Sequence, residues 1–131
     1  MAQNTNPVFA QQPSMVLITV TGSYTDRTGA TAGLYTLAAA GPSGSKVTQL
    51  GTKAMGTSIT GSVLFFITDT AGNNPRIFDE ILVVATTAAP GVASHRVYNA
   101  YADLQLDSGS LIKVAHTMHN SMSVAAQIGH F

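Results

Sequence analysis

Apolar residues in this chain come in short segments, and the residues between the segments favour turns. The segments are rich in Val, Ile, Thr, Phe and Tyr, which favour strands, whereas the intervals contain Gly, Pro, Ser and Asn. Short segments at such even spacing are typical of an all-β sandwich or barrel. The pattern predicts strands at residues 15–21, 33–38, 46–53, 62–68, 76–84, 94–106, 111–118 and 123–129. We therefore expect an all-β fold, an antiparallel sandwich of about eight strands.

Two of these segments, residues 62–68 and 76–84, are apolar at both odd and even positions. A strand without a polar face needs other protein on both sides. In the second segment, Asp79 and Glu80 interrupt one face each, which is typical of a sheet edge or rim. The two-sided strands favour association with copies of the same chain, and we therefore expect a homo-oligomer.

Segment 94–106 alternates most regularly, which predicts one buried face and one solvated face. The face expected to be buried holds Tyr98, Ala100, Ala102, Leu104 and Leu106, and the opposite face holds His95, Asn99, Asp103 and Gln105. Across all segments, the side chains that we expect to be mostly buried are Phe65, Ile67, Leu82, Tyr98, Leu104 and Val124.

Residues 1–14 differ from the rest of the chain because they show no periodicity and are rich in Asn, Gln and Pro. Alone, they cannot bury enough surface to offset the entropy lost on ordering. We expect an extended N-terminal arm that is ordered only by contact with a neighbour. Residues 15–131 contain no repeat and no internal boundary, so they predict a single β-sandwich domain.

The chain is poor in charge. Charged residues make up 9% of its 131 residues, against roughly 25% in typical soluble domains, and the net charge is zero. Such a surface repels other proteins weakly and suits stable contact with a partner. The cations are scattered singly along the sequence, which argues against a nucleic-acid partner and against a polybasic membrane patch.

The absence of cysteine excludes disulfides and thiolate chemistry. The N-terminus lacks the positive start and long apolar run of a signal peptide. The longest apolar runs are far shorter than a membrane span, so we expect no membrane partner.

Two histidines, His116 and His119, have the spacing His-x-x-His. On a helix this spacing could place two zinc ligands on one face. Here it falls at the end of a predicted strand without a third acidic or cysteine ligand nearby, so we interpret both residues as part of a polar strand edge and turn. We predict no metal site and no other cofactor.

Three carboxylates, Asp69, Asp79 and Glu80, are candidates for acid–base chemistry. Paired carboxylates hydrolyse glycosidic bonds, but carbohydrate sites usually add exposed aromatic rings, and this chain has no Trp. We interpret Asp69 as a turn cap and the other two as rim residues. The nucleophile pattern Gly-x-Ser-x-Gly is also absent, so we expect no catalytic residue and predict that the chain is not an enzyme.

Several motifs resemble, in the same order, those of a family of small bacteriophage virion proteins. Gly44-Ser-Lys-Val, Lys53-Ala-Met-Gly-Thr and Gly61-Ser-Val-Leu-Phe-Phe-Ile resemble the family's Gly-Ser-Arg-Ile, its Lys-Ala-Thr-Gly-Thr turn and a strand that ends in an aromatic and Ile. Near the C-terminus, Ile112-Lys-Val stands where the family has Leu-Arg-Ala. The final Val124-Ala-Ala-Gln-Ile-Gly-His-Phe stands where it has Val-Ile-Ala-Glu-Gly-Gly-Asp-Phe or -Tyr. The resemblance covers residues 44–131.

The resemblance implies a jelly-roll-like sandwich within a phage particle, without cofactor or catalytic residues. It implies a head decoration (cement) protein that is made in the host cytoplasm and binds the major capsid protein on the capsid exterior. A trimer is favoured because it suits a three-fold seam of a capsid. The alternative is a tail or head-fibre module that recognises host-surface glycan. Its candidate residues are Tyr24 with Asp26 and Arg27, or Tyr98 and Tyr101.

Overall fold

The computed structural model describes residues 12–21, 27–28, 34–117 and 121–131, in which all regular secondary structure is β-strand. The strands are β1 (Gln12–Val20), β2 (Tyr35–Ala39), β3 (Ser45–Ala54), β4 (Gly61–Ile67), β5 (Arg76–Val83), β6 (Arg96–Leu106), β7 (Leu111–His116) and β8 (Met122–His130). Each strand overlaps one predicted segment, so the predicted all-β class is confirmed. β1 begins earlier than predicted because Gln12, Pro13 and Ser14 pair with the end of β8. The remainder of the predicted arm, residues 1–11, lies outside the described residues.

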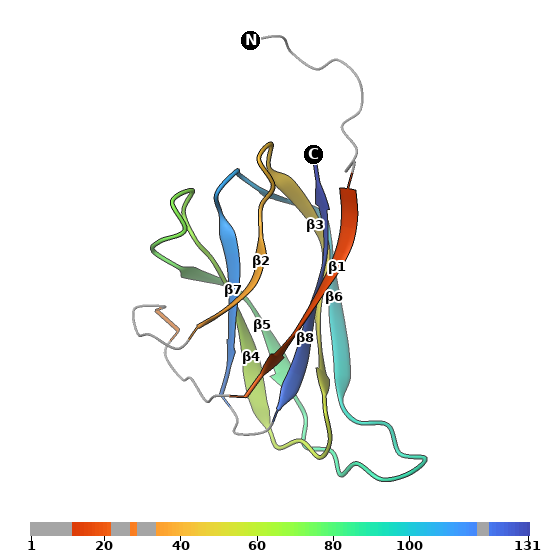
Figure 1. Cartoon of the computed structure of the whole chain (residues 1–131). Helices are drawn as coiled ribbons and strands as arrows, with labels where there is room; N and C mark the ends of the chain where they lie inside the picture. The colour runs from red at the N-terminus through yellow and green to blue at the C-terminus, as the bar shows by residue number, and fades with distance from the viewer. Residues whose placement is uncertain (1–11, 22–26, 29–33, 118–120) are drawn as a thin grey trace, which may run out of the picture.

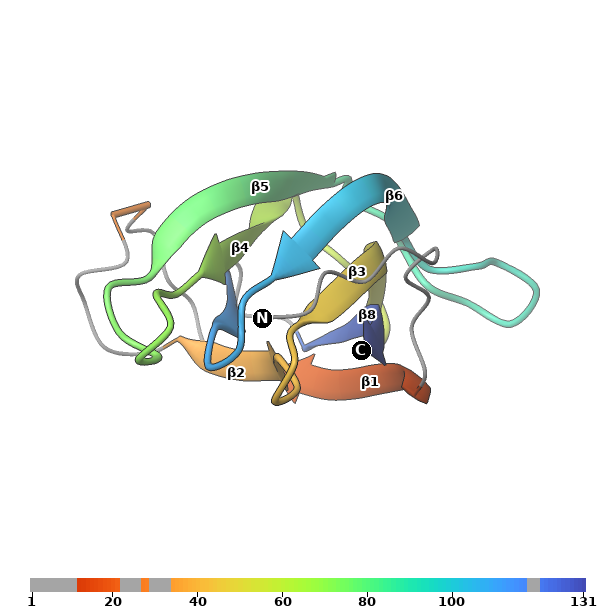
Figure 2. The same ribbon diagram turned by 90° about the horizontal axis from the view of Figure 1, so that it is seen from above.

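The strands form two four-stranded antiparallel sheets, in the orders β1-β8-β3-β6 and β2-β7-β4-β5 (Figure 1). The first half of the chain pairs with the second half in reverse order: β1 with β8, β2 with β7, β3 with β6 and β4 with β5. Two further ladders, β3 with β8 and β4 with β7, join these pairs into sheets. This is the strand order of a jelly roll. Seen from above, β1 and β2 lie together along one side of the sandwich, and β5 and β6 along the other (Figure 2).

The main core fills the space between the two sheets. The prediction of burial is confirmed for Phe65 and Val124, both fully buried, while Ile67 and Leu104 are partly buried against the same core. It is wrong for Leu82, which is 61% exposed. The fully buried apolar members of this core also include Val20, Val47, Leu50, Val63, Val83, Ile112, Val114 and Met122.

A β-bulge in β5 explains the position of Leu82. The ladder between β4 and β5 shifts between Phe65 and Phe66, which leaves Phe78 as an extra residue on β5. The extra residue changes the alternation along the strand. Phe78 and Ile81 therefore both pack into the core, and Leu82 faces outward.

A register shift also breaks the alternation predicted for β6. Before the shift, Val97 and Tyr101 pack against the core, and after it Leu104 and Leu106 do so. The uninterrupted alternation could not reveal a shift that depends on the partner strand β3. Three residues of β6 that we predicted to be buried lie outside the core instead. They are Tyr98, Ala100 and Ala102.

β4 is covered on both of its faces, as its sequence predicted. One face enters the main core, and the other places Leu64 and Phe66, both fully buried, in a second apolar cluster. Ala115 of β7 belongs to this cluster, and Leu34 and Ile77 pack against it. The cover is supplied by the same chain, so this face of β4 does not require a second copy.

Truncation of Phe65 tests the position of the main core. We expect Phe65→Ala to lower the free energy of unfolding by about 3–5 kcal/mol because the side chain is fully enclosed. Leu82→Ala is the matched control and should cost less than about 0.5 kcal/mol, since Leu82 lies on the surface. Urea unfolding measures both values, and equal losses for the two variants would contradict the placement of these strands.

Candidate functional site

The interpretation of His116 as part of a polar strand edge is wrong, because this histidine lies in the interior of the protein. Its side chain is fully buried, and its Nε2–H donates a hydrogen bond to the carbonyl oxygen of Val20 at 2.7 Å. This bond joins the end of β7 to the end of β1. His119 lies outside the described residues, so the His-x-x-His pair stays untested as a pair. Among the described side chains, no three His, Cys, Asp or Glu residues are grouped as metal ligands.

Asp69 caps the turn that follows β4, as predicted. Its Oδ1 accepts hydrogen bonds from the backbone N–H groups of Ala71 and Asn73, at 3.0 and 2.8 Å. Its Oδ2 accepts a third from the side-chain amide of Asn74 at 2.9 Å. These bonds, the one from Asn73 foremost, hold the pKa of the Asp69 carboxyl below its usual value. The carboxylate is therefore committed to the turn.

Asp79 links β5 to β6, which are edge strands of the two different sheets. It accepts a short hydrogen bond from the hydroxyl of Tyr101 and a second, of 3.3 Å, from the amide of Asn99. Burial, with the bond to Asp79, raises the pKa of Tyr101, so its hydroxyl stays protonated and acts as a donor.

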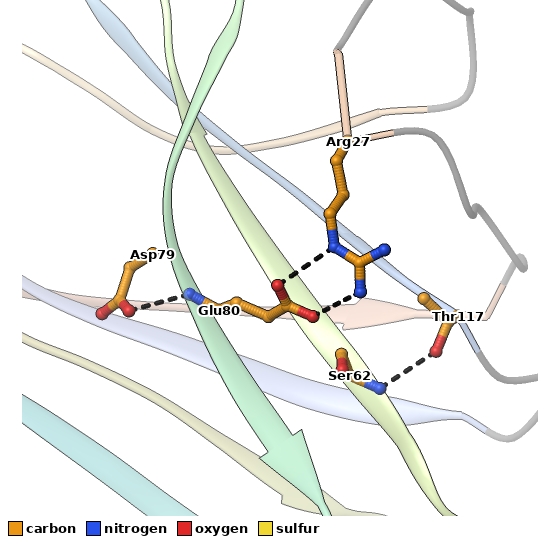
Figure 3. Close-up of polar contacts among 5 residues, drawn as sticks. All are labelled: Arg27, Ser62, Asp79, Glu80 and Thr117. Carbon is orange, nitrogen blue, oxygen red and sulfur yellow. Dashed lines mark hydrogen bonds and ion pairs between the residues drawn. The ribbon is translucent and has the colours of Figure 1, made fainter.

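Glu80 engages a different partner, on the outer face of the β2-β7-β4-β5 sheet. Its two carboxylate oxygens accept hydrogen bonds from Arg27 Nη2 and Nε, at 2.7 and 3.1 Å (Figure 3). The bond from Arg27 is the main reason why the pKa of Glu80 lies below its usual value. Asp79 and Glu80 thus serve separate contacts, and they do not form the acid–base pair that glycoside hydrolysis requires.

The structure brings together one Ser–His contact that the sequence did not indicate. Ser45 Oγ lies 2.5 Å from His130 Nδ1 and accepts a hydrogen bond from the backbone N–H of Gly41 at 2.8 Å. Ser45 is fully buried, so no substrate can reach its hydroxyl. The contact closes the turn between β2 and β3 onto the end of β8. These residues are far apart along the chain, which is why no local motif signals their contact.

Tyr98 lies on the outer face of the β1-β8-β3-β6 sheet, directly over Gly51. A Cβ atom at Gly51 would lie 1.7 Å from Cδ1 of the tyrosine ring, so the ring occupies the space that a side chain would fill. The guanidinium carbon of Arg96 lies 4.6 Å from the centroid of the same ring. The ring is thereby held between backbone and cation, and Tyr101 is engaged by Asp79. Both aromatic residues proposed for glycan contact already have partners within the chain.

The connections at the lower end of the sandwich in Figure 1, together with the adjoining end of β5, carry five exposed apolar side chains, and we call this region the apolar end. The two connections are residues 55–60 between β3 and β4 and residues 84–95 between β5 and β6, and neither contains Asp, Glu, Lys or Arg. Backbone hydrogen bonds of 2.8 and 3.1 Å between Ser58 and Thr86 tie the connections together. The apolar end comprises Met55, Ile59, Leu82, Val84 and Val92, each 48–61% exposed.

The hollows on the surface of the described residues include one of about 360 Å³ and one of about 400 Å³. The first lies beside the start of β1 and includes Met15, Lys46 and Gln127 in its lining. The second lies beside Asp107 and Phe131. Neither lining contains a histidine or a pair of carboxylates, so neither offers acid–base chemistry.

Gly51 provides a test of the Tyr98 placement. We expect Gly51→Ala to destabilise the protein by about 1–3 kcal/mol because the new methyl group displaces the ring. In a Tyr98→Ala background the same substitution should become neutral or stabilising by about 0.5–1 kcal/mol, since alanine suits a strand better than glycine. Urea unfolding of the four proteins gives the result. A penalty that is equal in both backgrounds would show that the ring lies elsewhere.

The Arg27–Glu80 pair provides a pH test. Because the pKa of Glu80 is lower in the folded state, the pair stabilises the protein above the ordinary carboxyl value of about 4.3 and ceases to do so as the pH falls through the folded-state value. We expect Arg27→Gln to lower the melting temperature at pH 7 but not at pH 2.5. Arg76→Gln is the control, and its effect should not follow the same titration. A deficit in Arg27→Gln that persists at pH 2.5 would contradict the pairing.

No family model matches this sequence, and no curated protein matches it. The described part of the chain contains no helix that is long and apolar enough to cross a membrane. What the chain does must therefore be inferred from its surface and its motifs.

Proposed function

We propose that this chain is a structural virion protein that binds the assembled capsid of a tailed phage and stabilises it as a decoration protein. The observation that supports the proposal is the apolar end, where exposed apolar side chains lie on two connections without charge and on the adjoining end of β5. Several large apolar side chains exposed at one end of a small domain suit an interaction surface. The jelly-roll order and the motifs that resemble those of small virion proteins agree with this role.

The composition of the apolar end suits stable binding to a partner protein. Fixed hydrogen bonds between its two connections limit the entropy lost on binding, so more of the burial energy appears as affinity. A small protein that binds the assembled shell and not its free subunits shifts the equilibrium toward the shell by mass action. The major capsid protein, at the seams between its subunits, is the partner in this proposal.

A homo-oligomer, with a trimer at a three-fold seam, stays part of the proposal. The second face of β4, which first suggested self-association, is covered within the chain. Leu82 of β5 is the remaining exposed apolar residue on the two strands concerned that could contact another copy.

Recognition of a host glycan is the alternative function. Such a site needs free aromatic platforms, and the described candidates, Tyr98 and Tyr101, are engaged by Arg96 and Asp79. Tyr24 and Asp26 lie outside the described residues. The geometry therefore supports the decoration role better than glycan recognition.

Binding to particles tests the proposal. Shells produced without this protein should bind the purified chain saturably, at a fixed ratio to the major capsid protein, and should then disassemble at a higher temperature. Ile59→Asp should weaken binding at least about tenfold because it places a charge in an apolar contact. Ser43→Asp, in the turn between β2 and β3 at the opposite end, adds the same charge and should bind like the wild type.

Two outcomes would contradict the proposal. One is the absence of binding to shells at micromolar concentrations. The other is binding confined to host-surface glycan or to tail structures, which would favour the alternative function.

A further inference from the structure

The outer face of the β1-β8-β3-β6 sheet places two cations directly opposite each other. Lys53 of β3 pairs in register with Arg96 of β6, so their side chains project from the same face as nearest cross-strand neighbours. Both are exposed, and the flanking residues of β3, Thr52 and Ala54, are buried. In sequence these cations are far apart, and only the pairing of β3 with β6 joins them.

No described carboxylate neutralises this pair. The single ion pair among the described side chains is Arg27–Glu80, which lies on the other sheet. Asp103, the one acid on β6, is seven positions from Arg96, roughly 23 Å along a strand. Like charges directly opposite each other destabilise a sheet, so the arrangement is unfavourable unless something else supplies negative charge.

Both cations are held in place by neighbouring groups. Lys53 Nζ donates a hydrogen bond of 2.7 Å to Ser94 Oγ, which in turn donates one of 2.7 Å to the carbonyl oxygen of Ala54. The guanidinium of Arg96 lies against the ring of Tyr98, which is itself seated over Gly51. A cation that is already positioned loses less entropy when it binds an anion.

The cation pair lies at the border of the apolar end. Lys53 is followed after one residue by the connection that carries Met55 and Ile59, and Arg96 directly follows the connection that carries Val92. The two features together have the anatomy of one interface, with an apolar centre and a charged rim.

We propose that Lys53 and Arg96 bind carboxylate side chains that a partner protein presents beside an apolar patch. The proposal rests on the proposed function, because it takes that partner to be the shell subunit that contacts the apolar end. The guanidinium of Arg96 matches a carboxylate with two parallel N–H bonds, and the ammonium of Lys53 adds a second positive charge. Two cations beside an uncharged apolar surface fit an acidic rim better than a nucleic-acid backbone, which requires a longer positive track.

The first experiment uses the isolated protein and does not depend on the shell. Lys53→Glu places opposite charges on the two strands and should raise the melting temperature above that of Lys53→Gln by about 1–3 °C at low salt. Millimolar citrate, a tricarboxylate, should raise the melting temperature of the wild type more than that of the double variant Lys53→Gln/Arg96→Gln. A citrate effect equal in both proteins, or no gain from charge reversal, would overturn the assignment of an anion site.

The second experiment measures the rate of binding to undecorated shells at several salt concentrations. Rim charges act mainly on association, so the double variant should bind about three- to tenfold more slowly than the wild type at low salt and equally fast at 0.5 M salt. Lys113→Gln, which removes a cation from β7 on the other sheet, is the matched control and should bind at the wild-type rate.

The outcomes separate this inference from the proposed function. If the wild type binds shells, Ile59→Asp does not, and the double variant matches the wild type at all salt concentrations, the carboxylate site is wrong and the decoration role stands. If the wild type fails to bind shells, the proposed function is wrong, and the citrate experiment alone decides whether the anion site exists. Retention of single-stranded DNA that is lost in the double variant would assign the pair to nucleic acid and overturn the protein partner.

Discussion

The pairing of β1 with β8 joins the two ends of the described chain, and the rest of the sandwich depends on this long-range closure. Gln12 opposes His130, and every strand of the first half finds its partner in the second half in reverse order. Such contacts close very long loops, so their entropic cost has to be met by the whole core at once. Only β4 and β5 pair across a short turn, where Asp69 organises the backbone.

Hydrogen bonds of polar side chains, in the interior and at the edges of the sheets, help to hold these distant strands together. His116 joins β7 to the end of β1, Ser45 and His130 fasten the turn between β2 and β3 to β8, and Asp79 links β5 to β6. The bonds of His116 and Asp79 connect strands that no ladder joins, and the Ser45–His130 bond adds to the ladder between β3 and β8. Buried polar groups of this kind are costly unless they are paired, so the pairs specify one arrangement of the two sheets.

The structural contacts of the polar side chains also determine which groups remain available at the surface. The carboxylates of Asp69, Asp79 and Glu80 are held in structural contacts, whereas the apolar end and the cation pair at its border are exposed, as are Met15 and Leu17 of β1. An apolar centre with a charged rim has the composition of many protein–protein interfaces. The proposed decoration role rests on these surface features and on the resemblance of residues 44–131 to small virion proteins.

The sequence alone determined the all-β class, the position of every strand to within a few residues and the two-sided burial of β4. These properties follow from local alternation and from turn residues, which a single chain segment displays by itself. The cap formed by Asp69 was predictable for the same reason, because its partners lie within five residues of it.

Tertiary structure alone decided which way Leu82 and Tyr98 face, because a bulge or register shift is a relation between two strands and leaves no mark on the alternation of either. It also decided that Lys53 and Arg96 stand together and that Ser45 meets His130. Those neighbours are brought together by ladders between distant strands. Distance along the chain therefore concealed the charge pair and the Ser–His contact, although their residues were visible in the sequence from the start.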